Sequence, residues 1–176
     1  MEVNTVNNKK LDLDNFDNPD GFDGFDLKIT RISDEEVQRI AQMAGGLQDG
    51  IIYIMPESRS KEFDLLNKYS ADLKKFAAKE NITCELVHGN EYKYLELKDS
   101  DVILPFTVSF SASAVYDLIK SFITRSFPRD TNNLQVKINT KRKKNLFYEK
   151  IEISGKPEGV LKALELLKND ESGSEA

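Results

Sequence analysis

Length, composition and charge exclude several classes of protein before any motif is considered. The chain has 176 residues, 39% of them hydrophobic and 31% charged, which suits one globular domain with short tails. Its net charge of −5 argues against bulk attraction to nucleic acid or to anionic membranes. A single cysteine, Cys84, excludes an internal disulfide, and a single histidine, His88, excludes a zinc site built from several Cys and His ligands. We therefore expect no metal and no cofactor.

The ends of the chain point to a cytoplasmic protein. The first ten residues lack the apolar core of a signal peptide, and no apolar run approaches the ~18 residues of a membrane span. Residues 1–25 are rich in Asp, Asn, Gly and Pro, which disfavour regular structure, and residues 1–26 carry a net charge of −5. Their aspartates lack the spacing of an EF-hand calcium loop. We predict a flexible acidic tail over residues 1–25, one domain over residues 26–169, and a short acidic tail over residues 170–176.

The first half of the domain alternates strands and helices. Residues 26–32 alternate apolar and polar side chains, as a strand does, and Ser33 and Glu36 then form a capping box for a helix that ends at Gly45. Residues 51–55 are a buried strand. A long helix is predicted from about residue 61 to Asn81, and residues 82–87 return as a strand parallel to residues 51–55. Residues 92–97 are expected to form a short edge strand.

The second half centres on a buried strand and a core helix. Residues 102–108 are a short apolar run rich in β-branched residues, and the following helix has one apolar stripe. Residues 134–139 and 146–153 are predicted to form an antiparallel pair, and Pro157 suits the first turn of a last helix. The predicted fold class is α/β, a mixed sheet with packed helices that closes on an αββα unit. The stripe of the core helix comprises Val115, Leu118, Ile119, Phe122 and Ile123.

The phrase Ile-Glu-Ile-Ser-Gly-Lys-Pro-Glu-Gly-Val-Leu, residues 151–161, resembles the closing segment of the effector-associated constant component domains of bacterial conflict systems. The resemblance covers about the last 65 residues of the chain. It implies a non-catalytic adaptor that couples effectors to partner proteins. It contains no invariant chemical motif, so it implies no site residue.

Two polar clusters are candidate sites. The first follows a buried strand and begins a predicted helix, where an α/β sheet binds anions; a solvated helix start explains it equally well. It comprises Ser58, Arg59, Ser60 and Lys61. The second is a basic hairpin with a net charge of +5 over residues 137–150, in which two aromatic residues follow the cluster of cations. Its candidate binding residues are Lys137, Lys141, Arg142, Lys143, Lys144, Phe147 and Tyr148.

The basic hairpin has three interpretations. It is a solvated turn whose charges protect the sheet edge, or it grips phosphates and stacks bases of a nucleic acid. In the third, it binds a protein partner or the acidic N-terminal tail, either as an internal mask or in self-association. The sequence favours a non-enzymatic binding module or adaptor that acts through protein–protein contacts, as an accessory component of a bacterial defence or conflict system. The alternatives are a nucleic-acid-binding protein that uses this hairpin and a nucleotide- or phosphate-handling enzyme centred on residues 58–61.

Overall fold

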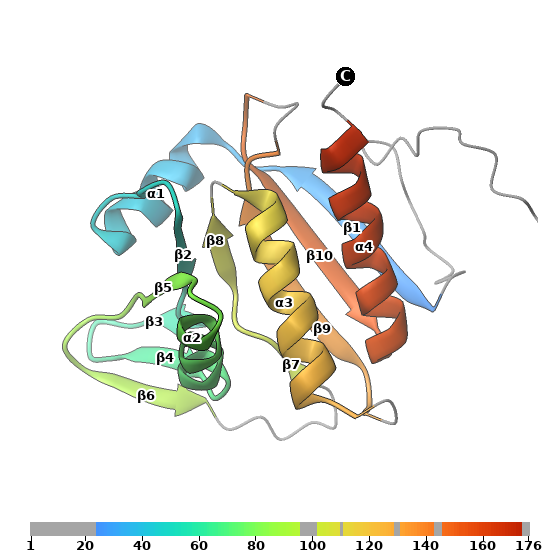
Figure 1. Ribbon diagram of the computed structural model, residues 1–176. Helices are drawn as coiled ribbons and strands as arrows, with labels where there is room; N and C mark the ends of the chain where they lie inside the picture. The colour runs from blue at the N-terminus through green and yellow to red at the C-terminus, as the bar shows by residue number, and fades with distance from the viewer. Residues whose placement is uncertain (1–23, 96–101, 110, 129–130, 143–145, 174–176) are drawn as a thin grey trace, which may run out of the picture.

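A mixed sheet of seven strands forms the centre of the molecule (Figure 1). The computed structural model describes residues 24–95, 102–109, 111–128, 131–142 and 146–173. The sheet order is β1-β10-β9-β8-β2-β5, and β7 also pairs with β9. The pairs β1–β10, β10–β9 and β8–β2 are antiparallel, whereas β8–β9, β7–β9 and β2–β5 are parallel. The strands are β1 (Phe25–Arg31), β2 (Ile51–Ile54), β5 (Thr83–Leu86), β7 (Val102–Ile103), β8 (Thr107–Ser109), β9 (Leu134–Thr140) and β10 (Glu149–Gly155). The predicted α/β fold with a mixed sheet is confirmed.

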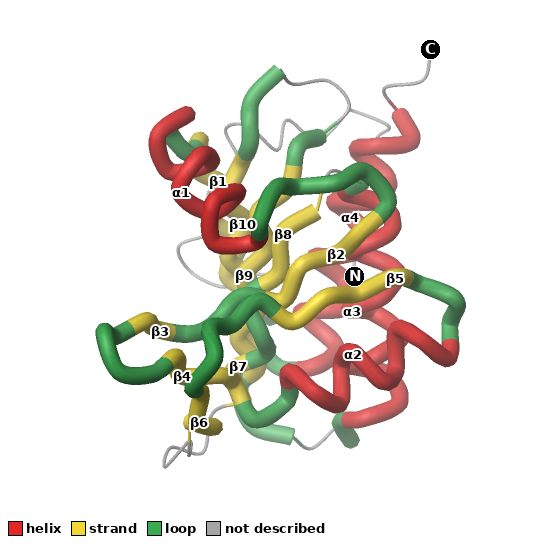
Figure 2. The backbone as a smooth tube through the Cα atoms, turned by 90° about the vertical axis from the view of Figure 1, so that its left-hand side faces the viewer, coloured by secondary structure: helices red, strands yellow, loops and turns green. Residues whose placement is uncertain are grey.

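Helices cover the two faces of this sheet unequally. Figure 2 shows α2 (Ser70–Lys79), α3 (Ala112–Ser126) and α4 (Pro157–Gly173) on one side and α1 (Asp34–Ala44) on the other. The larger core lies under α2, α3 and α4, where Ile151 and Ile153 of β10 and the even-numbered residues of β9 are buried. The smaller core lies under α1. It comprises Ile40, Tyr53, Met55, Val87, Val108 and Tyr148.

Among the described elements, α1 alone of the helices lies on that second face, and part of the face is polar and open. Lys28 on β1 lies opposite Glu152 on β10, which lies opposite Lys137 on β9, so three strands carry a row of alternating charge. Opposite charges at directly paired positions stabilise a sheet modestly. We call this the open face of the sheet.

Local signals in the sequence are confirmed wherever the determinants are close in the chain. The Ser33 hydroxyl accepts a hydrogen bond from the Glu36 amide at 3.2 Å and begins α1, and Gly45 ends it with φ 72°. β2 and β5 are parallel and joined through α2, as predicted. Pro157 is the first residue of α4.

The long helix predicted from residue 61 is wrong in its first half. Residues 58–67 instead form a hairpin of β3 (Ser58–Arg59) and β4 (Asp64–Asn67), and β6 (Tyr92–Leu95) adds to β4 in parallel. These strands make a second sheet in the order β3-β4-β6, which we call the small sheet. Leu66 and Leu73 are both fully buried, so the apolar stripe marked core positions correctly, but a strand followed by a helix buries them as well as one helix would.

Two further boundaries differ from the predictions. The buried strand predicted at residues 102–108 is divided into β7 and β8, because Pro105 lies between them and has no N–H to donate to a ladder. The acidic tail predicted from residue 170 is wrong at its start, since α4 continues to Gly173 and Glu171 is buried. Of the N-terminal tail predicted at residues 1–25, residues 1–23 lie outside the described residues, and the prediction is wrong at Phe25, which is buried and begins β1. Within the residues that are described, no helix is both long and apolar enough to cross a membrane.

Candidate functional site

The basic hairpin does not present its cations on one surface. Lys137 is exposed on the open face of the sheet, Lys141 is half-buried, and Arg142 has no exposed surface at all. Tyr148 belongs to the smaller core. The guanidinium carbon of Arg31 lies over the ring of Phe147, 4.3 Å from the ring centroid. Lys143 and Lys144 lie outside the described residues. Burial therefore removes Arg142 and Tyr148 from any partner-binding surface.

Arg142 is instead the centre of a buried ionic cluster. Its Nε and Nη2 donate to the two carboxylate oxygens of Glu149 at 2.9 and 2.7 Å, and its Nη1 donates to Asp170 at 2.8 Å. Glu149 comes from β10 and Asp170 from the end of α4, so the cluster ties the β9–β10 hairpin to the last helix. Burial first, and then the nearby carboxylate of Glu171, raise the pKa of the Tyr116 phenol far above its ordinary value. The arrangement is structural in character, because a buried arginine with two buried acidic partners is held in one geometry.

The anion site predicted at residues 58–61 loses its physical basis. No helix begins there, so no helix N-terminus is available for a phosphate. The Ser60 hydroxyl is used within the β3–β4 turn, where it donates to the Phe63 carbonyl at 2.8 Å and accepts from the Phe63 amide at 3.1 Å. Ser58 and Lys61 are exposed, and Arg59 is held by Asp64.

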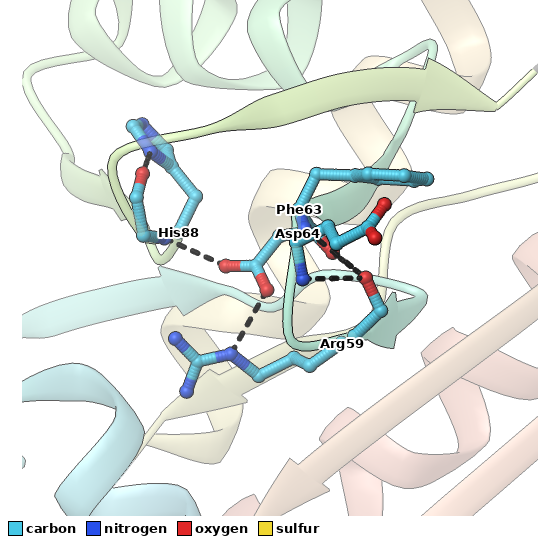
Figure 3. Close-up of polar contacts among 7 residues, drawn as sticks. Arg59, Phe63, Asp64 and His88 are labelled. Carbon is cyan, nitrogen blue, oxygen red and sulfur yellow. Dashed lines mark hydrogen bonds and ion pairs between the residues drawn. The ribbon is translucent and has the colours of Figure 1, made fainter.

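Asp64 fixes the corner between the small sheet and the loop after β5 (Figure 3). One of its carboxylate oxygens accepts from Arg59 Nε at 3.1 Å, and the other accepts from the Gly89 amide at 2.6 Å. His88 Nδ1 lies 2.7 Å from the Gly89 carbonyl oxygen. Burial alone would raise the pKa of Asp64, but the Arg59 and Gly89 hydrogen bonds, with the charges of Arg59 and His88, outweigh it and lower the pKa below 3.8. Asp64 is therefore ionised, and its carboxylate holds the Arg59 side chain and the Gly89 amide in place.

This corner supports a row of exposed aromatic rings on β6. Tyr92 and Tyr94 are 44% and 47% exposed, and alternation along the strand places them on the same face. The ring centroids of His88 and Tyr92 are 4.5 Å apart, and those of Tyr92 and Tyr94 are 5.9 Å apart in an edge-to-face arrangement. Among the residues that the structure describes, β6 has β4 on one side and no strand on the other. We call residues 92–95 with this free side the β6 edge.

A second candidate is a cleft of about 390 Å³ on the open face of the sheet. Its polar lining comprises Glu36, Glu57, Lys137, Asn139 and Lys150, and Phe106 supplies an aromatic wall. Asn139 is only 2% exposed, and among the described residues its Oδ1 has no hydrogen-bond donor. Leaving such a carbonyl unpaired costs about 1–3 kcal/mol, so a buried amide of this kind needs an explanation. We call this hollow the sheet-face cleft.

Sequence reasoning missed both of these features for different reasons. Residues 92–97 were expected to form an edge strand, and alternation within it would already have placed Tyr92 and Tyr94 on one face. By contrast, Asn139 falls among the polar positions of β9, beside Gln135 and Lys137, and nothing local shows that it is buried. Its burial depends on segments before β8 and after β2, far away in the chain.

Among the described residues, no three His, Cys, Asp or Glu side chains are placed to hold a metal ion together. The only cysteine, Cys84, is buried, and burial raises the pKa of its thiol to about 12. No protein-family model, no curated protein and no solved structure matches this chain.

Proposed function

We propose that the chain is a non-enzymatic binding module, an adaptor that takes up an extended segment of a partner protein at the β6 edge. The observation that carries this proposal is the side of β6 on which no strand lies among the described residues, together with the two exposed tyrosines of that strand. Peptides add to such edges as an extra strand: main-chain hydrogen bonds supply affinity and side-chain contacts supply specificity.

The β6 edge is held rigid from behind, as a recognition strand needs to be. β4 pairs with β6 over its whole length, from Asp64 opposite Tyr92 to Asn67 opposite Leu95. Asp64 and Asn67 are both buried and hydrogen-bonded, and this fixes the strand that supports the edge. A partner would therefore meet a preorganised surface and lose little affinity to ordering it.

The chemistry of the β6 edge favours a protein partner over a nucleic acid. Tyrosine is enriched at the energetic centres of protein interfaces, where its ring is buried and its hydroxyl stays hydrogen-bonded. The best-fitting segment is an extended one with aromatic or β-branched side chains at alternate positions, which would pair with Tyr92 and Tyr94 across the new ladder. A nucleic-acid site would need a surplus of exposed cations, and the basic hairpin has lost Arg142 to a buried ionic cluster.

An adaptor role also agrees with the resemblance of residues 151–161 to the effector-associated constant component domains. On that basis we propose that the partner belongs to a bacterial defence or conflict system. The experiment below tests the binding mode independently of this assignment.

The test is a selection of random displayed peptides on the immobilised chain, followed by affinity measurements with the enriched peptides. The double variant Tyr92→Thr/Tyr94→Thr keeps β-branched residues in the strand and should weaken binding at least tenfold, since truncating a central interface tyrosine removes upwards of ~1–2 kcal/mol. Leu146→Thr is the matched control, because Leu146 is also a large exposed apolar residue, at 93%, but lies between β9 and β10 of the main sheet. It should leave affinity unchanged.

Hydrogen exchange identifies the mode of binding. Peptide binding should protect the β6 amides that point away from β4, because they become donors in the new ladder. Peptides that bind with no new protection in residues 92–95, or that bind equally well to the double variant, would refute the proposal.

A further inference from the structure

The sheet-face cleft places three polar side chains of two paired strands around one point. Lys150 on β10 lies directly opposite Asn139 on β9, and Lys137 lies two residues before Asn139 on the same strand. All three side chains point to the open face, because alternate residues of a strand share a face. The cleft, with a volume of about 390 Å³, is within the size range of small-molecule sites.

Asn139 gives this cleft a recognition group. Its side chain is nearly completely buried and lines the cleft, and its carbonyl oxygen has no hydrogen-bond partner in the part of the chain that the structure describes. A carboxamide offers one acceptor and two donors side by side, so it can pair in two places with a flat polar ring. Adenine fits this pattern, since asparagine accepts from its amino group and donates to the adjacent ring nitrogen.

The remaining lining supplies a wall for the ring and charges for an anion. Phe106 is half-buried beside the fully buried Pro56, and an aromatic face of this kind is a stacking surface for a base. Lys137 forms no ion pair among the described residues, and Lys150 has only Glu152, at 3.5 Å. Both ammonium groups are therefore able to meet an anionic group.

The two glutamates limit the size of that anion. Glu57 already accepts from Asn67 at 2.9 Å, and Glu36 pairs with Arg39 at 3.2 Å, but both stay in the cleft lining. Their charges balance those of the two lysines, so an extended chain of phosphates would meet repulsion. A single phosphate close to Lys137 and Lys150 would not.

We propose that the sheet-face cleft binds an adenine mononucleotide. In this arrangement the base stacks on Phe106 and pairs with the Asn139 carboxamide, and the phosphate lies between Lys137 and Lys150. The site is separate from the β6 edge, because none of the residues in its lining belongs to β6, and its one link to the small sheet among the lining contacts named above is the hydrogen bond between Glu57 and Asn67 of β4. A module that binds a peptide segment at one surface would thus carry a nucleotide at another.

The experiment measures the melting temperature and the affinity of the full chain with adenosine 5′-monophosphate, guanosine 5′-monophosphate, adenosine and ribose 5-phosphate as separate probes. Adenosine 5′-monophosphate at a hundredfold excess over its Kd should raise the melting temperature by roughly 5–10 °C, since it binds the native state alone. Adenosine and ribose 5-phosphate each lack half of the recognised chemistry and should bind at least tenfold more weakly. Guanosine 5′-monophosphate carries a carbonyl where adenine carries the amino group, and should also bind at least tenfold more weakly.

Variants separate this site from any other. Lys137→Gln should weaken binding of adenosine 5′-monophosphate at least tenfold, whereas Lys28→Gln, an exposed lysine on the same face but outside the cleft, should not change it. Asn139→Asp should abolish the preference for adenine over guanine. If Asn139→Asp does not fold, the comparison of Lys137→Gln with Lys28→Gln still tests the proposal.

Three outcomes would overturn the proposal. The first is that no nucleotide changes the melting temperature, in which case an ordered water, and not a base, would be the hydrogen-bond partner of Asn139. The second is equal binding of ribose 5-phosphate and adenosine 5′-monophosphate, which would make the cleft an anion site without a base. The third is equal loss of affinity in the Lys137 and Lys28 variants.

Discussion

At the scale of single residues, burial decides what a charge can do. Arg142 and Lys137 lie five positions apart in the same basic stretch, but the first has no exposed surface and the second faces solvent. The difference follows from the strand period, because even-numbered residues of β9 and the Arg142 side chain point to the larger core, where Glu149 and Asp170 receive the guanidinium. Lys137 instead lies on the open face of the sheet, where its charge is exposed to solvent.

Replacement of Arg142 by methionine should destabilise the fold by about 3–5 kcal/mol, because it leaves the buried carboxylates of Glu149 and Asp170 without their cation. Urea unfolding of the variant measures this loss. The triple variant Arg142→Met/Glu149→Gln/Asp170→Asn removes the charges together and should recover most of the stability. A loss below about 1 kcal/mol in Arg142→Met would show that the cluster does not hold the hairpin to α4.

At the scale of elements, close backbone approach fixes where α4 meets β1. A Cβ atom built on Gly159, in the first turns of α4, would lie 2.1 Å from the Gly24 carbonyl oxygen. A Cβ atom on Gly155 would lie 2.5 Å from the same oxygen, so both glycines allow the chain before β1 to pass close to the αββα unit. The opposing atoms are backbone and cannot move aside as a flexible side chain would.

The substitution Gly159→Ala should therefore destabilise the protein by about 1–3 kcal/mol, the usual cost of overpacking. This is the opposite sign to the general rule, by which alanine is more favourable than glycine inside a helix by roughly 1 kcal/mol. The matched variant Ala78→Gly, at an exposed position of α2, measures that intrinsic preference in the same chain. Chemical denaturation of both variants tests the prediction, and a Gly159→Ala protein as stable as the wild type would contradict the close approach.

Elements were predictable from the sequence where their determinants are local, and mispredicted where tertiary contacts decide. Ser33, Glu36 and Gly45 lie close together in the sequence and fix both ends of α1, so the helix was predictable. The segment that became β4 contains Asp64 and Asn67, polar residues that no helix stripe explains, and their burial depends on Gly89 and Ile103 much later in the chain. The same limit applies to the candidate sites, because positions in the sequence do not show that Arg142 contacts Asp170 or that Phe106 and Asn139 line one cleft.

At the scale of the whole molecule, two sheets share one body through a few buried polar contacts. Asn67 on β4 donates from its Nδ2 to the Ile103 carbonyl at 2.7 Å and to Glu57 at 2.9 Å, and thereby joins the small sheet to β7 and to the chain after β2. Asp64 performs the corresponding role for the loop after β5. The small sheet depends on these polar links more than the main sheet does, because the larger apolar core lies under α2, α3 and α4.

This dependence predicts that acid loosens the small sheet first. The folded-state pKa of Asp64 is lowered, so its stabilisation is complete above the ordinary pKa of about 3.8 and is lost as the pH falls through the lower folded value. Hydrogen exchange of the Gly89 and β6 amides should accelerate below about pH 4 while β9 and β10 remain protected.

The substitution Asp64→Asn should lower the free energy of unfolding by about 1–3 kcal/mol at pH 7, and its difference from the wild type should become smaller as the pH falls. Asp26→Asn, an exposed change on β1, is the control and should leave both measurements unaltered. Simultaneous loss of protection in both sheets at low pH would mean that the molecule unfolds as one unit, and that Asp64 does not separate the behaviour of the small sheet from that of the main one.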